Sequence, residues 1–461
     1  MKPVKLSRRV FIFGAAIAAT GCATARRGRI RVSANEKLNI AGIGVGGQGS
    51  GDLRNCGTEN IVALCDVDWN RAADTFKTFP NATKYKDFRV MLEKERGIDA
   101  VVISTPDHTH AVAAMACMEL GKHVRVQKPL THSISEARKL TEAARRYRVS
   151  TAMGNQGHSG DGVRQMCEIL WSDAIGFVRE AHIWTNRPVW PQGIARPTVV
   201  DPVPDYLDWD LWLGPAPHRP YVGKYPGTDT PCYCPFVWRG WWDFGCGALG
   251  DMGCHIMDPA YWALQLGAPT SVECLQQEGN NEETGPTKSI IKYEFPARPF
   301  KEKYRSVKWF KKTLPPVTVY WYDGGLMPPV PQGISAEEKL GDGDNGSYFV
   351  GEKGIATTGC YGGGTRLLPA EKMEGFELPE PVIPRVPLGD SYQDWIRSCK
   401  DGKPHCANFD YAGPFTEMVL LGNLAVRSGA KIEWDSVNMR VTNMPDANRF
   451  VTRRYRQGWS L

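Results

Sequence analysis

The feature that most constrains this chain is the segment 38–49, in which a short apolar run leads directly into three spaced glycines. Their spacing is G-x-G-x-x-G: Gly44 allows a tight turn, Gly46 lets the backbone approach a pyrophosphate, and Gly49 permits close helix–strand packing. The helix that follows directs the positive end of its dipole at the phosphates. This order of strand, turn and helix predicts a dinucleotide-binding Rossmann unit.

An acidic residue at the end of the next predicted strand indicates which dinucleotide is bound. The apolar run 61–65 predicts that strand, and Asp66 follows it, 22 residues after Gly44. A carboxylate at this position accepts hydrogen bonds from both ribose hydroxyls and repels a 2′-phosphate, which favours NAD over NADP. The alternative interpretation is that Asp66 only caps the next helix.

Further alternation of strands and helices predicts a parallel α/β sheet and a Rossmann domain over residues 36–155. The expected elements are strands at 98–103 and 123–126 and a helix at 109–120. Ser133 and Glu136 form a capping box, which predicts a helix that reaches Tyr147.

The first 35 residues are interpreted as a targeting segment and linker. Residues 1–31 hold eight basic residues and no acidic one, while the remainder carries 48 Lys and Arg against 50 Asp and Glu. This near balance removes the electrostatic argument for a nucleic-acid partner.

The leader also predicts where the protein resides. Arg8 and Arg9 precede the apolar run 12–19, which is too short to span a bilayer, and the pair resembles a twin-arginine signal for export of folded proteins. Ala19-Thr20-Gly21-Cys22 resembles a lipobox, so Cys22 is a candidate lipid anchor and the only expected membrane contact. The expected location is the periplasm or envelope. The alternative is an ordinary basic N-terminus of a cytosolic protein.

The 13 cysteines give no metal site. Only Cys232, Cys234, Cys246 and Cys254 cluster, and their spacing matches no standard zinc-ligand pattern, so no metal is expected. An oxidising compartment would favour a disulfide, but the sequence does not indicate a pairing.

Two motifs in the first half of the chain resemble those of a known enzyme family. The segment 104–110 reads S-T-P-D-H-T-H and 127–129 reads Q-K-P; both resemble the Gfo/Idh/MocA family of NAD(P)-dependent oxidoreductases, from about residue 36 to the C-terminus. In that family an E-K-P motif carries the catalytic lysine and often a cis-proline. Here Gln127 replaces the glutamate, which changes the charge around Lys128. The resemblance and the glycine turn together predict these cofactor-binding residues: Gly44, Gly46, Gly47, Gln48, Gly49, Asp66, Ser104, Thr105, Pro106, His110, Lys128, Pro129, Asn155 and Gln156.

A second constellation lies in the segment 250–255, which reads G-D-M-G-C-H. Asp251 and His255 are four residues apart and share one face if the segment is helical. The resemblance implies that they form the catalytic set with Lys128. His255, titrating near neutral pH, is expected to be the base, Lys128 to donate to the reacting oxygen, and Asp251 to orient the site. The alternatives are a helix cap and a buried structural histidine, and Pro259 is expected to end or kink the helix.

The second half is rich in tryptophan, with eight of the 15 between Trp184 and Trp262. Such rings stack on sugar rings, but they also pack cores and subunit interfaces, and both interpretations stay open. A carbohydrate is the expected substrate. The candidate substrate-binding residues are Lys128, His158, Trp184, Arg187, Trp190, Trp238, Asp251 and His255.

At 461 residues the chain is too long for a single core, so residues 156–461 are expected to form a second domain. Apolar runs predict strands at 271–274, 289–295, 317–321 and 348–357, loops at 300–346 and 360–390, and helices at 390–398 and 414–427. The resemblance implies an α/β domain with a large open, mostly antiparallel sheet, one face of which serves oligomerisation. The whole chain is thus predicted to be an α/β protein that forms a homo-oligomer.

Export limits the possible functions, because a bacterial envelope holds no pool of free NAD. The cofactor must therefore enter before export, stay bound and be restored in each cycle. A sugar or glycoside oxidoreductase that oxidises one sugar and reduces another meets this demand. A redox-neutral glycosidase that works through a transient 3-keto sugar, as relatives of the family do, meets it too. The third hypothesis is a non-catalytic, lipid-anchored sugar-binding protein, against which Lys128, Asp251 and His255 argue.

Overall fold

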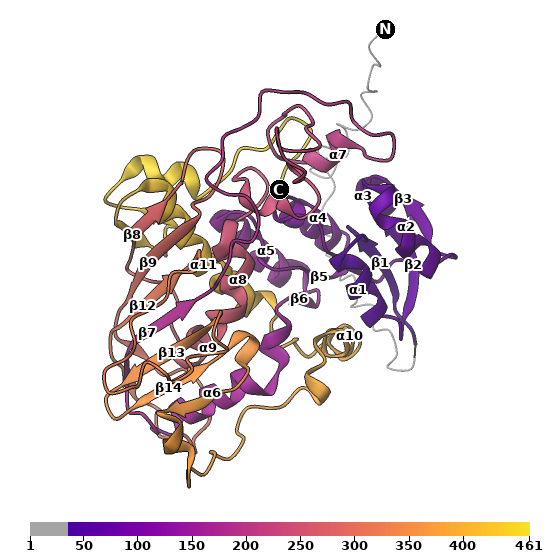
Figure 1. Cartoon of the computed structure of the whole chain (residues 1–461). Helices are drawn as coiled ribbons and strands as arrows, with labels where there is room; N and C mark the ends of the chain where they lie inside the picture. The colour runs from indigo at the N-terminus through magenta and orange to yellow at the C-terminus, as the bar shows by residue number, and fades with distance from the viewer. Residues whose placement is uncertain (1–35) are drawn as a thin grey trace.

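A computed structural model describes residues 36–461, and the predicted leader, with Arg8, Arg9 and Cys22, lies outside them. The first domain is a six-stranded parallel sheet in the order β3-β2-β1-β4-β5-β6 (Figure 1). Its strands are β1 (Asn39–Ile43), β2 (Asn60–Cys65), β3 (Thr83–Tyr85), β4 (Ala100–Ile103), β5 (His123–Val126) and β6 (Thr151–Met153). Its helices are α1 (Gln48–Asn55), α2 (Trp69–Thr78), α3 (Phe88–Lys94), α4 (Asp107–Glu119) and α5 (Ile134–Tyr147). The Rossmann prediction is confirmed.

Local signals set the boundaries of these helices. The Ser133 side chain accepts from the Glu136 N–H while the Glu136 carboxylate accepts from the Ser133 N–H, which is the predicted capping box. The strand β3 and the helix α3 were not predicted, because each is short and carries no apolar period.

The second domain is built on a nine-stranded sheet in the order β15-β14-β13-β7-β12-β9-β8-β16-β17. Within this sheet, as described over residues 36–461, only the β7–β12 pairing is parallel, so the prediction of a large, mostly antiparallel sheet is confirmed. The strands are β7 (Val178–Trp184), β8 (Ser271–Glu278), β9 (Lys288–Phe295), β12 (Val317–Tyr322), β13 (Gly346–Gly351), β14 (Ile355–Thr358), β15 (Arg366–Leu368), β16 (Ile432–Asp435) and β17 (Arg440–Val441). A separate pair is formed by β10 (Arg298–Pro299) and β11 (Thr313–Leu314).

The predicted and observed elements of the second domain differ at three places. The expected strand 348–357 is the hairpin β13–β14, which turns where the Gly351 N–H donates to the Gly354 carbonyl. The last long helix begins at Phe409 rather than at Pro414, because the Asn408 side chain caps it and the proline is tolerated one turn inside. The central strand β7 was not predicted at all.

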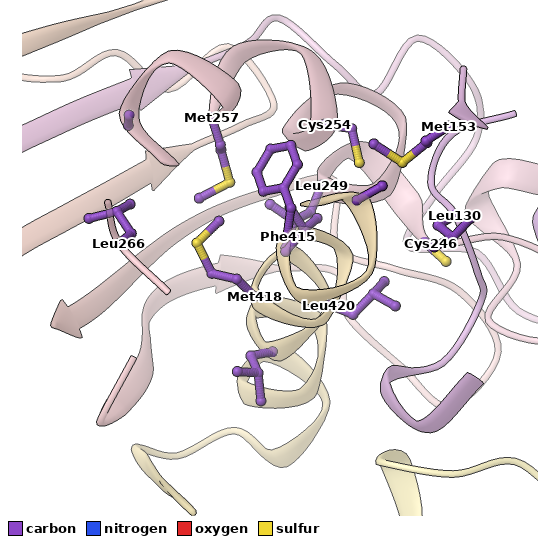
Figure 2. Packing of buried hydrophobic residues seen from close by; sticks show 14 of the residues in the cluster. Leu130, Met153, Cys246, Leu249, Cys254, Met257, Leu266, Phe415, Met418 and Leu420 are labelled. Atoms are coloured by element: carbon purple, nitrogen blue, oxygen red, sulfur yellow. The ribbon is translucent and has the colours of Figure 1, made fainter. Parts of the chain in front are cut away.

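The helices of the second domain are α6 (Asp161–Trp171), α7 (Trp209–Leu213), α8 (Gly247–Ile256), α9 (Asp258–Ala263), α10 (Ser391–Asp401) and α11 (Phe409–Ser428). Of these, α8 and α11 lie between the two sheets, whereas α10 lies beside α1 of the Rossmann domain and α7 lies near α3 (Figure 1). Figure 2 shows α11 at the centre of the main core, where its residues Phe415 and Met418 pack with Leu249 of α8 and with Met257, which directly follows α8. Met153 of the Rossmann sheet belongs to the same cluster. This shared core fixes α8 relative to the Rossmann domain.

None of the helices in residues 36–461 is long and apolar enough to cross a membrane.

Candidate active site

One cleft of about 560 Å³ runs along the carboxyl ends of the Rossmann strands and against the second domain. At one end it is lined by Gly44, Gly46 and Asp66. At the other end it is lined by Asp251 and His255, with Lys128 alongside them. The predicted cofactor-binding and catalytic residues therefore share a single space.

The glycine turn has the backbone that its sequence predicts. Gly44 has a φ of +75°, in the left-handed region that favours glycine. A Cβ at Gly49 would lie 1.9 Å from the Gly44 carbonyl oxygen, so α1 can approach the turn only without a side chain there. These two positions leave the N-terminus of α1 open toward the cleft.

Asp66 is held in place by the backbone around it. One carboxylate oxygen accepts from the Gly46 N–H and the other from the Asp68 N–H, each at 2.9 Å. The residue that caps α2 is Asp68, which accepts from the Arg71 N–H, so Asp66 is not the cap. Burial raises the pKa of Asp66 to about 6, against the effect of these hydrogen bonds. Asp66 thus faces the cleft at the position where a carboxylate is needed to bind the ribose hydroxyls.

Among the buried polar atoms that lack a partner within the described residues are one on Thr105, in the cleft lining, and one on Asn155, which precedes the lining residue Gln156. The Thr105 hydroxyl and the Asn155 side-chain amide nitrogen are buried and make no hydrogen bond within the described part of the chain. Unpaired buried donors are costly unless a ligand or water satisfies them. The open glycine turn, the Asp66 carboxylate and these donors together fit a dinucleotide.

The catalytic set is assembled around one carboxylate. The Asp251 side chain accepts from Lys128 Nζ at 2.8 Å and from Arg239 Nε at 3.1 Å, and Lys128 also donates to the Asp251 carbonyl. Burial acts to raise the pKa of Asp251, but the Lys128 and Arg239 cations lower it to about 2. Asp251 is therefore ionised and fixes the Lys128 ammonium in the cleft.

His255 lies one helical turn after Asp251 on the same face of α8, as its spacing predicted. Its Nδ1 is 3.2 Å from the Asn155 side-chain oxygen, so the tautomer that donates to this oxygen carries its proton on Nδ1. The other ring nitrogen makes no hydrogen bond to any described residue, so its lone pair is free. Burial, and next the Lys128 ammonium, lower the pKa of His255 well below its ordinary value. The expectation that His255 titrates near neutral pH is therefore wrong, and the ring is neutral.

Two family models match the chain. One, described as oxidoreductase family, NAD-binding Rossmann fold, covers residues 38–155, and the other, described as oxidoreductase family, C-terminal alpha/beta domain, covers 184–296. The chain belongs to the Gfo/Idh/MocA family. The resemblance inferred from the segments 104–110 and 127–129 is confirmed, and NAD is its cofactor.

Curated relatives within this family are similar over part of their length. Inositol 2-dehydrogenase 1 of Saccharopolyspora erythraea is 29% identical over 180 residues, which cover 34% of this chain and 53% of the relative. A glycosyl hydrolase family 109 protein of Shewanella pealeana is 29% identical over 180 residues, which cover 32% of this chain and 39% of the relative. The chain thus spans about half, or less, of the curated relatives it matches.

Solved structures share the fold at low identity. The NAD complex of GenD2 from gentamicin A biosynthesis is 18% identical, with a TM-score of 0.53 over 90% of this chain and 100% of that chain. An aldose–aldose oxidoreductase from Caulobacter crescentus, complexed with glycerol, is 13% identical, with a TM-score of 0.53 over 86% and 100%. These matches establish the architecture of this Gfo/Idh/MocA member.

The other predicted cofactor residues fall into two groups. Those that line the cleft are Gln48, Ser104, Thr105, Pro106 and Gln156. Those that support it from behind are Gly47, Gly49, His110, Pro129 and Asn155. His110 is buried, and its ring nitrogens lie 2.9 Å from the Pro129 carbonyl and 2.8 Å from the Thr105 carbonyl. It therefore braces the wall of the cleft, and the Lys128–Pro129 bond that it holds is cis.

Arg187 and Trp238 line the cleft as predicted for substrate binding, but three other candidates do not. His158 is buried, bonded to Asp258 at 3.0 Å and stacked between two rings. Trp184 is fully buried and donates to the Gly343 carbonyl, and Trp190 is buried beside Gln192. These three side chains pack inside the second domain.

Most of the tryptophan-rich segment follows the packing interpretation as well. Trp209, Trp212, Trp241, Tyr233 and Phe244 form a small buried cluster of their own. Trp212 reaches the cleft from this cluster, and Trp238 borders it.

Three residues of the site were not predicted from the sequence. Asp52 accepts hydrogen bonds beneath the cofactor end, and Arg239 reaches Asp251 from a short helical turn. Tyr361 has a φ of +58° and sets its ring edge-on to His255, with ring centres 4.7 Å apart. The glycines at 359 and 362–364 could have indicated a special turn around Tyr361.

The cysteine cluster has a structural explanation. All twelve cysteines in residues 36–461 are free thiols, so no disulfide forms there. Cys246 and Cys254 are buried, and burial raises the pKa of Cys254 to about 12. They behave as small apolar residues.

Proposed function

We propose that this protein is an NAD-dependent oxidoreductase that acts on a hydroxyl of a sugar or glycoside. The observation that supports it most is the placement of Lys128, Asp251 and His255 in the same cleft as the glycine turn and Asp66. The names of its relatives, which include an inositol dehydrogenase, are in keeping with a polyhydroxylated substrate.

The chain's own residues supply the acid–base chemistry of this reaction. Bound NAD would provide the hydride acceptor. The unprotonated ring nitrogen of His255 takes the proton of the substrate hydroxyl, since its partner nitrogen is held by Asn155. The Lys128 ammonium donates to the same oxygen and stabilises the charge that develops there. Asp251 keeps that ammonium in position.

A redox-neutral glycosidase is the second candidate. Transient oxidation of the C3 hydroxyl to a ketone acidifies the C2–H, and a base removes that proton as the C1 leaving group departs. Water then adds to C1, the proton returns to C2, and the ketone is reduced again, so no external oxidant is consumed. The glycosyl hydrolase family 109 relatives favour this reading, as does a histidine that remains neutral. A purely sugar-binding protein would have no need for the arrangement around Asp251.

We further propose that the cofactor is loaded before export and recycled while bound. The twin-arginine pair Arg8-Arg9 and the lipobox at Cys22 support export to the periplasm or envelope. Replacing both arginines with lysine should leave the protein in the cytoplasm, and normal export of that variant would contradict the route. A homo-oligomer is proposed to form through the open face of the nine-stranded sheet, where Leu275 is exposed.

One experiment tests the function and separates the two candidates. The purified protein is incubated with a panel of glycosides in deuterated water, without added cofactor. The oxidoreductase should give keto sugars, while the glycosidase should release aglycone and place deuterium at C2. Protein that carries NAD but yields neither product with any sugar would overturn the proposal.

A further inference from the structure

The substrate end of the cleft carries more positive than negative charge. Lys128, Arg239 and Arg187 surround the single carboxylate of Asp251, with Arg187 Nε 3.8 Å from its second oxygen. His255, which lies beside these four charged groups, is neutral because burial, and next the Lys128 ammonium, lower its pKa. One carboxylate therefore faces three cations.

No other carboxylate restores the balance at this end. Asp107 lies behind the wall, where it accepts from the Cys246 N–H at 3.0 Å, and burial raises its pKa to about 7. Even when Asp107 is ionised, one positive charge remains in excess. The other acidic residues of the cleft belong to the ribose end, where Arg71 and Lys86 accompany them; they are Asp66, Asp68 and Asp87.

Both arginines present unused donors to the cleft. Arg187 uses Nη1 on the Asn186 side chain and Arg239 uses Nη1 on the Phe236 carbonyl. Nη2 of each makes no hydrogen bond within residues 36–461, and the two side chains are 31% and 22% exposed.

The Arg239 guanidinium is also fixed by aromatic packing. It lies 4.3 Å from the centre of the Trp238 ring and 4.5 Å from that of Phe236. A guanidinium held this way keeps its unused Nη2 in place, and a charge-assisted hydrogen bond from Nη2 is suited to an oxyanion.

We infer that the substrate is an acidic sugar or glycoside, whose carboxylate, sulfate or phosphate group binds Arg187 and Arg239 beside the reacting hydroxyl. The inference rests on the proposed function and names its substrate class. A neutral sugar would leave the excess charge uncompensated in a partly desolvated cleft.

The test compares sugars that differ only in charge. The panel pairs nitrophenyl glucuronides and galacturonides with the matching glucosides and galactosides, and adds glucose 6-phosphate and glucose 6-sulfate, which distinguish carboxylate from ester. Both turnover and equilibrium binding by calorimetry are measured. We expect the acidic member of a pair to bind roughly ten- to a hundredfold more tightly, the scale of one charge-assisted hydrogen bond. Added salt should weaken only the acidic member.

Two variants complete the test. Arg187→Met should remove most of the preference for the acidic sugar while the bound NAD content stays the same. Arg179→Met is the matched control, since Arg179 pairs with Glu352 on the far sheet and should leave the preference intact.

The possible outcomes separate the inference from the function. Equal binding of acidic and neutral sugars, with turnover present, would overturn the inference and leave the function standing. Loss of NAD from Arg187→Met would also overturn it, by assigning the arginine to the cofactor. Tight acidic-sugar binding without any turnover would support the inference and contradict the proposed function.

Discussion

The Asp52 carboxylate accepts a hydrogen bond from the Gln127 side-chain amide at 2.8 Å, beneath the wall of the cofactor cleft. Asp52 is fully buried, and its carboxylate also accepts hydrogen bonds from the side chains of Ser104, Gln48 and Tyr392. One carboxylate therefore joins four segments of the chain. The family motif that this chain resembles has glutamate in place of Gln127. Here Gln127 is a neutral amide after β5, and the negative charge of this contact is on Asp52 in α1.

This contact predicts a reciprocal rescue. Gln127→Glu would set two carboxylates in contact, and Asp52→Asn would leave the buried donors without a charge to bind. Each single variant should bind NAD roughly tenfold more weakly, the scale of one buried charge-assisted hydrogen bond. The double variant Asp52→Asn/Gln127→Glu should recover most of the affinity, measured by calorimetry. Additive losses in the double variant would show that the two residues act independently.

Lys128→Met should separate cofactor binding from turnover. The ammonium contacts Asp251 rather than the glycine turn, so the variant should keep its NAD. Turnover should fall by roughly a hundredfold or more, which is typical for the loss of a positioned acid–base or electrostatic group. Cofactor content after denaturation and steady-state rates are the measurements. Full activity in this variant would remove Lys128 from the catalytic set.

The lowered pKa of His255 predicts an unusual pH profile. A base is active only when unprotonated, so a lowered pKa extends activity to lower pH. The acid limb of kcat/KM that depends on His255 should therefore lie clearly below about 6.5, the ordinary histidine value. His255→Gln should lower the rate on the plateau and remove that limb. A limb centred near 6.5 that disappears in this variant would contradict the buried, neutral ring.

Asp66 predicts a selectivity that changes with pH. Its pKa of about 6 means that the carboxylate is charged above this pH and protonated below it. Only the charged form repels a 2′-phosphate, so the preference for NAD over NADP should be large at neutral pH and shrink as the pH falls through about 6. Dissociation constants for both dinucleotides across this range provide the measurement. Asp66→Asn should show a small preference that does not vary with pH.

Much of the fold follows from local patterns that the sequence displays. The glycine turn and the capping box at Ser133 depend on neighbours within a few residues, and Asp66 follows a predicted strand and contacts Gly46 of that turn; all three lie where the sequence indicated. The helix that carries Asp251 and His255 ends before Pro259, again as the sequence indicated. Short or interrupted elements such as β7 were not predicted, because charged residues break their apolar period.

The parts of the site that the sequence did not reveal depend on distant partners. Asp52 meets Gln127 and Tyr392, which are 75 and 340 residues away. His158 follows Asn155 closely in sequence, yet it turns into the core because Asp258, 100 residues away, binds its ring. No local pattern encodes such contacts, since they arise only when distant segments fold together, within one domain for Asp52–Gln127 and His158–Asp258 and between domains for Asp52–Tyr392.

The ribose end of the cleft is covered by residues of the second domain. The Trp69 N–H donates to the Tyr206 carbonyl and the Asp208 N–H to the Val67 carbonyl, which ties the segment before α7 to the chain just after Asp66. Arg456 pairs with Asp210 in α7, and this brings the C-terminal residues to the same place.

Trp459 also lies over the ribose end of the cleft, and its position there predicts that the cofactor is released slowly. Its ring lines the cleft, with the Arg89 guanidinium 4.5 Å from its centre and the Phe88 ring 6.1 Å away. Trp459→Ala should open the ribose end and speed NAD dissociation by roughly tenfold, the scale expected for losing one aromatic contact of 1 to 2 kcal/mol. Trp459→Phe should retain most of the slow release, and both variants should unfold at the wild-type temperature when NAD is absent. Stopped-flow displacement of NADH measures the rate. An unchanged rate in Trp459→Ala would mean that retention depends on the Rossmann domain alone.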